Sequence, residues 1–454
     1  MKKRMLAGLA VMAQTCIVQA GGLMSNTNQH IAFDRMMARG ASTEIDAAYS
    51  NPAGLVWGRE GWQLSINWQM ASQKRDIESY SPFNTDEGNR HTYEGTASAP
   101  VVPSLFAVYK HDRWAFSAMA GITGGGGKAN YEEGLPMFTV PLAALMNKLG
   151  MTSDQYETDA SMRGRQYIYG AQLGAAYRIN DWLSASVAFR LNYYDGNYKG
   201  HVIATPAGTD LQMVNVQLDC NQMAWRVSPV IGLNYHRNGL TLAAKYEFRA
   251  RFNAKNTTKT LTTKLNIPTE LVGGEAAAAA LKEKAAALLN PTLSNYVDGA
   301  KTRYDMPSLL SLAVGYEFSD RLRATVEYHF FDDKHAITTE DRQDALSGGT
   351  NEFLAGVEYD INKTFTVSAG TQRTDYGLSD GYQRNTSFAC DSWSVGLGGA
   401  VNISEHVRLN ASYFWTMYDD YTVASENYHS TNTSGSDTYS RTNHVVGIGI
   451  DYKF

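Results

Sequence analysis

Hydrophobic and polar residues alternate one by one along many stretches of this 454-residue chain. Residues 240–249, 322–330 and 407–415 show the pattern, with the charged side chains confined to one of the two alternating sets. Successive residues of a strand point to opposite faces of the sheet, so the pattern predicts strands with one apolar and one polar face. Many stretches reach the roughly nine to eleven residues that a tilted membrane strand needs. This length favours a lipid-facing barrel over a soluble β-sandwich.

Tight and long connections alternate between the predicted strands. Tight turns are expected at residues 111–113, 180–181, 237–239, 319–321, 362–363 and 404–405. Strands are expected near residues 60–76, 97–111, 113–124, 164–179, 182–200, 211–236, 239–256, 303–318, 322–338, 350–361, 364–377, 388–403, 406–422 and 438–454. Such alternation is typical of an up-and-down barrel with short periplasmic turns and long outer loops. Residues 59–454 are therefore predicted to form a 14-stranded antiparallel transmembrane β-barrel, with long extracellular helical loops near 125–163 and 257–302.

Both ends of the chain carry signals for export to the bacterial outer membrane. Residues 1–20 read as a signal peptide, because a basic start and a short apolar run lead to Val18-Gln19-Ala20. No later window approaches the roughly 18 apolar residues of a spanning helix. At the other end, apolar residues occupy every second position from Val446 to the terminal Phe454. This ending resembles the signature by which the barrel-assembly machinery recognises its clients, so that machinery is an expected partner during biogenesis.

Residues 21–58 lack alternation and read as short helices or turns with apolar side chains that favour burial. A fourteen-stranded barrel has a lumen too wide for its own side chains to fill, so this segment is expected to plug it. Its stretch ASTEIDAAYSNPAGL resembles the N-terminal hatch of the FadL/TodX family of outer-membrane transporters. The most specific match is the Asn-Pro-Ala run, followed by glycine: Asn51, Pro52, Ala53 and Gly54. The resemblance covers the mature chain in architecture and the hatch in motif.

The two long loops are expected to be helical and apolar. In the first, one helix face carries Phe138, Leu142, Leu145, Met146 and Leu149. In the second, residues 275–289 are rich in alanine and place Leu281 and Leu288 on one face. In FadL-like proteins the corresponding loops form a greasy groove that captures ligand first, which makes these side chains candidate substrate-binding residues. The alternative is that the two helices cap the barrel by packing on each other.

A run of glycines ends the third predicted strand. Gly121, Gly124 and Gly125 lack side chains that would resist a bend in the ladder. In the family, an inward kink of the third strand opens the barrel wall sideways, so these positions are candidates for a lateral opening. A flexible start to the long loop explains the same glycines.

The resemblance implies a channel for passive uptake of small hydrophobic molecules, such as long-chain fatty acids, with capture at the outer loops and lateral release. The expected partners are the hydrophobic ligand and outer-membrane lipid, around a monomer that needs no cofactor, metal or catalytic chemistry. Recognition of a carboxylate would need an inward cation, and Lys245, Arg249, Arg251 and Arg323 are candidates, although solvation of the lumen is the simpler role.

Other classes of function remain to be weighed. A general porin or an adhesin is the main alternative, and a barrel lipase is less favoured because no nucleophile motif is present. The net charge of -5 provides no basic footprint for nucleic acid. The mature chain keeps Cys220 and Cys390, too few for a disulfide framework and without zinc-type spacing. They are either paired or free, and two unpaired thiols are the favoured interpretation.

Overall fold

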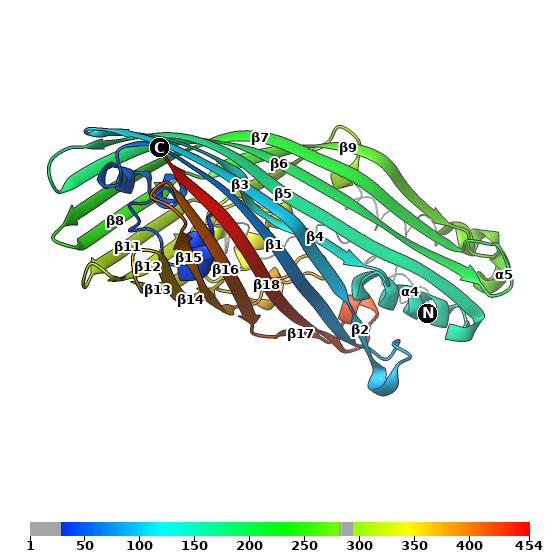
Figure 1. The fold of residues 1–454 in the computed structure, drawn as a ribbon. Helices are drawn as coiled ribbons and strands as arrows, with labels where there is room; N and C mark the ends of the chain where they lie inside the picture. The colour runs from blue at the N-terminus through cyan, green and yellow to red at the C-terminus, as the bar shows by residue number, and fades with distance from the viewer. Residues whose placement is uncertain (1–28, 281–282, 284–293) are drawn as a thin grey trace.

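The computed structural model describes residues 29–280, 283 and 294–454, so the predicted signal peptide lies outside the described residues. Within them, eighteen strand segments form one sheet. The sheet closes because β1 (Gly61–Tyr80) pairs with β3 (Gly95–His111) on one side and β18 (Gly435–Lys453) on the other. Every strand pairing is antiparallel. Figure 1 shows the resulting barrel of tilted strands.

The other segments follow one another around the barrel in chain order. They are β2 (Arg90–Tyr93), β4 (Trp114–Tyr131), β5 (Tyr156–Arg178), β6 (Leu183–Pro206), β7 (Val214–Arg237), β8 (Leu240–Glu247), β9 (Ala250–Leu265), β10 (Lys301–Met306), β11 (Leu309–Glu317), β12 (Leu322–Phe331), β13 (Thr350–Asp360), β14 (Phe365–Asp375), β15 (Ser392–Asn402), β16 (Val407–Tyr418) and β17 (Tyr421–Ser425). Four strands are each broken into two segments: β2/β3, β8/β9, β10/β11 and β16/β17. The described segments therefore make fourteen strands, which confirms the predicted barrel.

Short connections gather at one end of the barrel and long ones at the other. Each of the six predicted tight turns joins two neighbouring strands. At the turn between β7 and β8, Asn238 and Gly239 have φ of 52° and 77°, the left-handed conformations that a two-residue hairpin demands. We call this the turn end. The opposite, loop end carries α4 (Pro136–Lys148), α5 (Thr269–Val272), η3 (Glu87–Asn89), η4 (Ser153–Gln155), η5 (Ser294–Tyr296), η6 (Asp333–His335), η7 (Thr339–Ala345), η8 (Asp380–Tyr382) and η9 (Tyr428–Ser430).

The two long loops differ from their expected limits. β4 continues to Tyr131 and β5 begins at Tyr156, while β9 continues to Leu265 and β10 begins at Lys301. The connections thus span 132–155 and 266–300, inside the expected 125–163 and 257–302. The strand ends remain hydrogen-bonded ladders although their sequences lose the apolar alternation, because only the part of a strand that meets lipid needs an apolar face. β5, β6 and β7 have 23, 24 and 24 residues, so this wall extends far beyond the roughly nine to eleven residues of a spanning strand.

The outward face of the barrel is apolar and ringed by aromatic side chains. Close to the turn end, Trp62, Trp114 and Trp182 are exposed. Trp114 lies against Tyr177, with 4.6 Å between ring centroids, and Trp182 lies against Tyr235 at 5.6 Å. Exposed tryptophans beside the turns fit the aromatic girdle that sits at a membrane interface.

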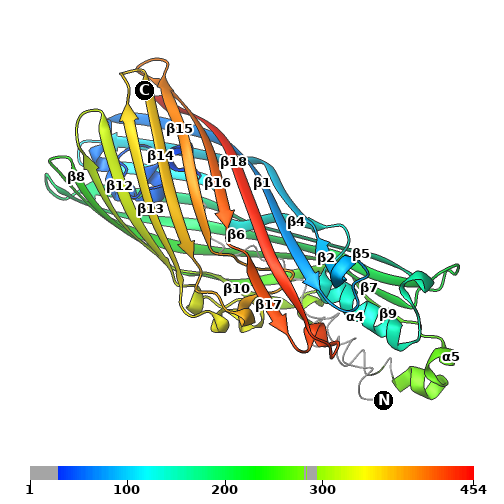
Figure 2. The ribbon, with the colours of Figure 1, turned by 90° about the horizontal axis from the view of Figure 1, so that it is seen from below.

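The segment from Gln29 to Gly58 lies inside the turn end of the barrel, drawn in dark blue in Figure 1 and seen through the strands in Figure 2. It contains α2 (Ile31–Met36), α3 (Ala47–Ser50) and the short 3-10 helix η2 (Pro52–Trp57). Most of its residues are buried, and residues 41–44, 57 and 58 are partly exposed. We refer to residues 29–58 as the hatch. Across the described residues, no helix combines the length and the apolar character needed to cross a membrane.

Candidate functional site

The Asn-Pro-Ala-Gly run fastens the hatch to the barrel wall. The Asn51 side chain donates hydrogen bonds to the carbonyl oxygens of Leu233 (3.0 Å) and Ala244 (3.3 Å), on β7 and β8. Its own oxygen accepts from the backbone N–H of Ala53 at 3.2 Å, which caps η2. Pro52 occupies the first turn of η2, where its missing N–H costs nothing. A Cβ atom on Gly54 would lie 2.1 Å from the carbonyl oxygen of Ser42, so only glycine fits there.

Charged side chains join the hatch to itself and to the opposite wall. Arg39 donates to Asp46 at 2.7 Å, and Arg408 on β16 donates to Glu44 at 2.8 Å. Burial alone would favour the neutral form of Glu44, but Arg408 and Arg39 lower its pKa well below the usual value. Arg35 of α2 contacts Glu358 on β13, and both side chains are fully buried. The pairs Arg35–Glu358 and Arg39–Asp46 are buried on both sides, whereas Glu44 keeps contact with solvent. Breaking one partner of a buried pair is costly.

A third group of contacts holds α3. Lys245 on β8 donates to the carbonyl oxygen of Tyr49 at 3.3 Å and to Glu247 at 2.7 Å. Arg190 on β6 donates to the same Glu247 at 2.7 Å and lies over the Tyr49 ring, 4.7 Å from its centroid. The buried Glu247 carboxylate holds both cations in place, and the two cations position Tyr49 by cation–π contacts.

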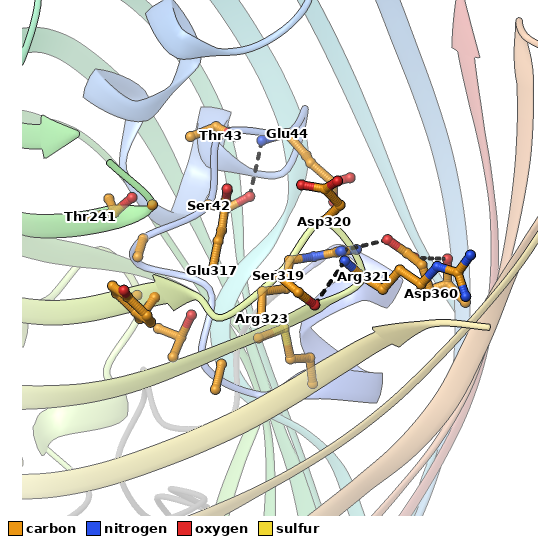
Figure 3. Close-up of a pocket in the computed structure, with 18 of the residues that line it drawn as sticks. Ser42, Thr43, Glu44, Thr241, Glu317, Ser319, Asp320, Arg321, Arg323 and Asp360 are labelled. Carbon is orange, nitrogen blue, oxygen red and sulfur yellow. Dashed lines mark hydrogen bonds and ion pairs between the residues drawn. The ribbon is translucent and has the colours of Figure 1, made fainter. Parts of the chain in front are cut away.

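A polar cavity of about 620 Å³ opens between the hatch and the turns of β11 to β14 (Figure 3). Glu44 and Ser42 line it from the hatch, and Arg323 and Asp360 line it from the wall. Arg323 donates to Asp360 at 2.7 Å and also contacts Glu358. The turn end of the lumen thus carries several paired charges and is a less favourable surface for an apolar molecule than the loop end.

The wall of the barrel is interrupted between β3 and β4. These strands pair at both ends, but residues 97–104 of β3 and 121–129 of β4 are not paired with each other. β4 stays paired with β5 through two register shifts, at Ile122/Gly124 and Gly124/Gly127. Gly125 has φ of 104°, and a Cβ atom there would lie 2.4 Å from the carbonyl oxygen of Gln166. The glycines provide the bulges that separate β4 from β3 while keeping it attached to β5.

The first described residue of the hatch lies beside this interruption. Ser104, at the end of the unpaired part of β3, donates to the carbonyl oxygen of Gln29 at 2.5 Å. A Cβ atom on Gly121 would lie 3.4 Å from the Gln29 side chain. The structure therefore brings the predicted glycines Gly121, Gly124 and Gly125 to one place in the wall, next to the hatch.

An apolar cluster fills the loop end of the lumen. The predicted residues of the first loop helix all belong to it: Phe138, Leu142, Leu145, Met146 and Leu149. Leu142 and Leu145 are 1% exposed, so they pack inside the barrel mouth instead of facing the outer solution. We call this group the outer apolar cluster; its other members include Ile77, Tyr93, Tyr131, Leu135, Met137, Met162, Tyr198, Phe388, Cys390 and Tyr439.

The second predicted loop helix is only partly within the described residues. Residues 275–280 are helical, as expected from their alanine content. Leu281 and Leu288, the two predicted binding residues of that helix, lie outside the described residues.

Most of the cations that the sequence offered for binding a ligand carboxylate already form ion pairs within the protein. Lys245 and Arg323 form the ion pairs above, Arg249 pairs with Asp332 at 3.1 Å, and Arg251 is exposed. Sequence reasoning missed the ion pairs between the hatch and the wall because their partners lie hundreds of positions apart. A signal was present: Arg35, Arg39 and Glu44 are charged side chains within a segment predicted to be buried.

Both cysteines are free and buried, which confirms the favoured interpretation of unpaired thiols.

We compared the chain with known protein families, sequences and structures. No protein-family model and no curated protein sequence matches the chain. Among solved structures, a Pseudomonas aeruginosa FadL homologue superposes with a TM-score of 0.66 at 14% identity, covering 96% of this chain and 100% of that one. The Ralstonia pickettii toluene transporter TbuX gives a TM-score of 0.55 at 13% identity, covering 96% and 99%. The P. putida toluene transporter TodX gives 0.53 at 15% identity, again covering 96% and 99%.

At these identities the likeness concerns the fold, and it extends over nearly the whole chain. The chain has the FadL/TodX-type fold.

Proposed function

We propose that this protein is an outer-membrane channel for passive uptake of small hydrophobic molecules, with long-chain fatty acids or similar compounds as its ligands. An apolar ligand is captured in the outer apolar cluster, passes into the lumen and leaves sideways through the wall into the membrane. The FadL homologue and the toluene transporters have the same fold, which supports this class of function. No covalent step is needed.

The observation that carries the proposal is the interruption between β3 and β4 beside the hatch. Unpaired backbone groups facing lipid are strongly unfavourable, so such an edge is tolerated where it lines a passage. Apart from Lys128, the two unpaired edges carry residues no larger than isoleucine, and most are glycine, alanine, serine or proline. The polar, hatch-filled turn end opposes straight passage, and the interruption provides a sideways route.

The driving force for capture is burial of apolar surface. Each square ångström of ligand surface removed from water is worth roughly 25 cal/mol. A cluster shielded from water and placed at the loop end lowers the barrier that the polar outer leaflet presents to a greasy molecule. The ligand then moves down its own concentration gradient, so no energy source is required.

Blocking the interruption tests the lateral route. Val102 is half-buried on the unpaired part of β3, and the native thiols are buried. In proteoliposomes, a bulky methanethiosulfonate adduct on Val102→Cys should reduce uptake of a radiolabelled long-chain fatty acid at least about fivefold, because it occupies the passage. The same adduct on Ala120→Cys, which is exposed on the paired part of β4, is the matched control and should leave uptake unchanged. Equal uptake by the two modified variants would contradict lateral release. Absence of uptake by the wild type would contradict the transport function.

A further inference from the structure

Arg441 is a buried cation that forms no ion pair with a carboxylate among the described residues. Arg441 on β18 points inward and is 7% exposed. Its Nε and Nη1 atoms have no hydrogen-bond partner, and no described carboxylate lies within ion-pair distance of it. Arg35, Arg190 and Lys245, which are equally buried, each contact a glutamate. Two unsatisfied donors on a buried guanidinium are unfavourable, so the site fits an additional acceptor.

The neighbours of Arg441 make the site more cationic. Arg75 on β1 is the direct register partner of Arg441 across the β1–β18 ladder, and it too is buried. Like charges directly opposite each other on a sheet repel, and an anion between them would remove the repulsion. The Arg441 guanidinium lies over the Tyr418 ring, 4.5 Å from its centroid, which orients its planar donors. A planar guanidinium of this kind suits the two oxygens of a carboxylate or the oxygens of a sulfonate.

The arginines lie at the border between an apolar and a polar part of the lumen. The next inward pair toward the loop end is Ile77 and Tyr439, both members of the outer apolar cluster. The next inward pair toward the hatch is Gln73 and Asn443. A ligand with an apolar body and one anionic end would therefore fit this part of the lumen. Its body would lie in the outer apolar cluster and its anionic end would lie at Arg441.

We propose that Arg441, with Arg75 opposite, forms a binding site for the anionic head group of an amphipathic ligand. The inference rests on the proposed uptake function and deepens it, because it names the residues that would favour a charged fatty acid over its neutral ester. It also assigns a specificity-determining role to a residue pair on the β1–β18 seam, away from the hatch.

The test compares an acid with its ester in the full-length protein. Binding of radiolabelled laurate and of methyl laurate is measured in lipid nanodiscs at pH 8, with empty nanodiscs subtracted. Arg441→Gln should weaken laurate binding by about tenfold or more and leave methyl laurate within about twofold, because only the acid carries the charge. Arg441→Lys keeps the charge and should restore most of the affinity. Lys199→Gln, which removes an exposed cation from β6, is the matched control and should leave both ligands unaffected.

The outcomes separate this inference from the uptake function. Unchanged laurate binding in Arg441→Gln, or equal weakening of acid and ester, overturns the head-group site. A wild type that binds the ester but not the acid overturns it too, while transport of hydrophobic compounds stands. A wild type that binds neither overturns both.

A second measurement avoids any folding defect of the variants. A laurate with a diazirine next to its carboxylate is photolysed on the wild-type protein, and the labelled peptides are mapped by mass spectrometry. Labels are expected around residues 73–77, 416–418 and 439–443, and labels confined to other parts of the chain would contradict the site.

Discussion

Cys390 tests how tightly the loop end is packed. The residue has no exposed surface and belongs to the outer apolar cluster. Burial raises the pKa of its thiol to about 12, so the reactive thiolate is scarce at neutral pH. We expect N-ethylmaleimide at pH 8 to leave Cys390 unmodified in the folded barrel and to label it after heating in sodium dodecyl sulfate, as measured by peptide mass spectrometry. Val102→Cys on the half-exposed β3 edge serves as the positive control, and rapid labelling of native Cys390 would show that the cluster is open.

We expect Asp333 to make the loop between β12 and β13 sensitive to pH. It lies in η6, and its carboxylate accepts from the backbone N–H of Thr350 at 3.3 Å. Burial raises its pKa to about 6. The folded loop therefore prefers the protonated carboxyl, and between about pH 4 and 6 it binds more protons than the unfolded chain. The stabilisation is present at low pH and is lost as the pH rises through 6.

The corresponding measurement is limited proteolysis of the loop between β12 and β13. Cleavage within 332–349 should be slower at pH 5 than at pH 8 in the wild type. Asp333→Asn keeps the side-chain size and removes the charge, so its loop should be cleaved at the same rate at both values. A wild type without pH dependence would show that the carboxylate stays solvated.

At the scale of elements, the burial of α4 in the barrel mouth allows its proposed role in ligand capture to be tested. Leu142 and Leu145 are buried, whereas Asn147 on the same helix is exposed. Leu142→Ala and Leu145→Ala should each weaken the packing of the loop end by about 2 to 5 kcal/mol and slow uptake at low ligand concentration. Asn147→Ala is the control and should behave as the wild type in both uptake and thermal unfolding. Normal uptake by the leucine variants would reduce α4 to a structural cap.

The strands were predictable because their cause is local. Alternation is set by which side chains meet lipid, and tight turns need residues such as Asn238 and Gly239 that adopt positive φ. The glycines of β4 were also visible, together with two alternative roles for them. Their effect depends on β3, where Pro100 and Pro103 fall within the unpaired stretch and each lacks a backbone donor. The sequence of either strand alone does not show which pair of strands loses its hydrogen bonds. That depends on how all the strands fit together in the closed sheet.

The interior contacts were not predictable in this way. Glu44 meets Arg408, and Arg35 meets Glu358, across more than three hundred positions. The sequence pattern of an inward polar residue is the same whether its side chain contacts water, another side chain or a ligand. Arg441 illustrates the limit, because its inward position follows from alternation while its unsatisfied donors appear only once the hatch and the neighbouring strands are in place.

At the scale of the whole molecule, the proposed uptake function requires the hatch to keep the barrel from acting as an open pore. Fourteen strands enclose a lumen that side chains alone do not fill, and residues 29–58 occupy its turn end. Strand pairing closes the barrel without the hatch, through β1 and β18, so the wall should assemble when the hatch is absent. The ion pairs of the hatch would then be replaced by water in a wide lumen.

Deletion of residues 29–58 should therefore give a folded barrel with large, stable conductance in planar bilayers, where the full chain is nearly silent. Heat-modifiable migration on electrophoresis checks that the deleted protein has folded. Glu44→Gln is a milder matched change, because it removes one carboxylate from the contacts with Arg39 and Arg408 while leaving the chain in place. It should produce brief openings between silent periods, since a loosened hatch shifts without leaving. A deletion that folds and stays as silent as the full chain would mean that the long loops close the lumen, and the hatch would then have no part in gating.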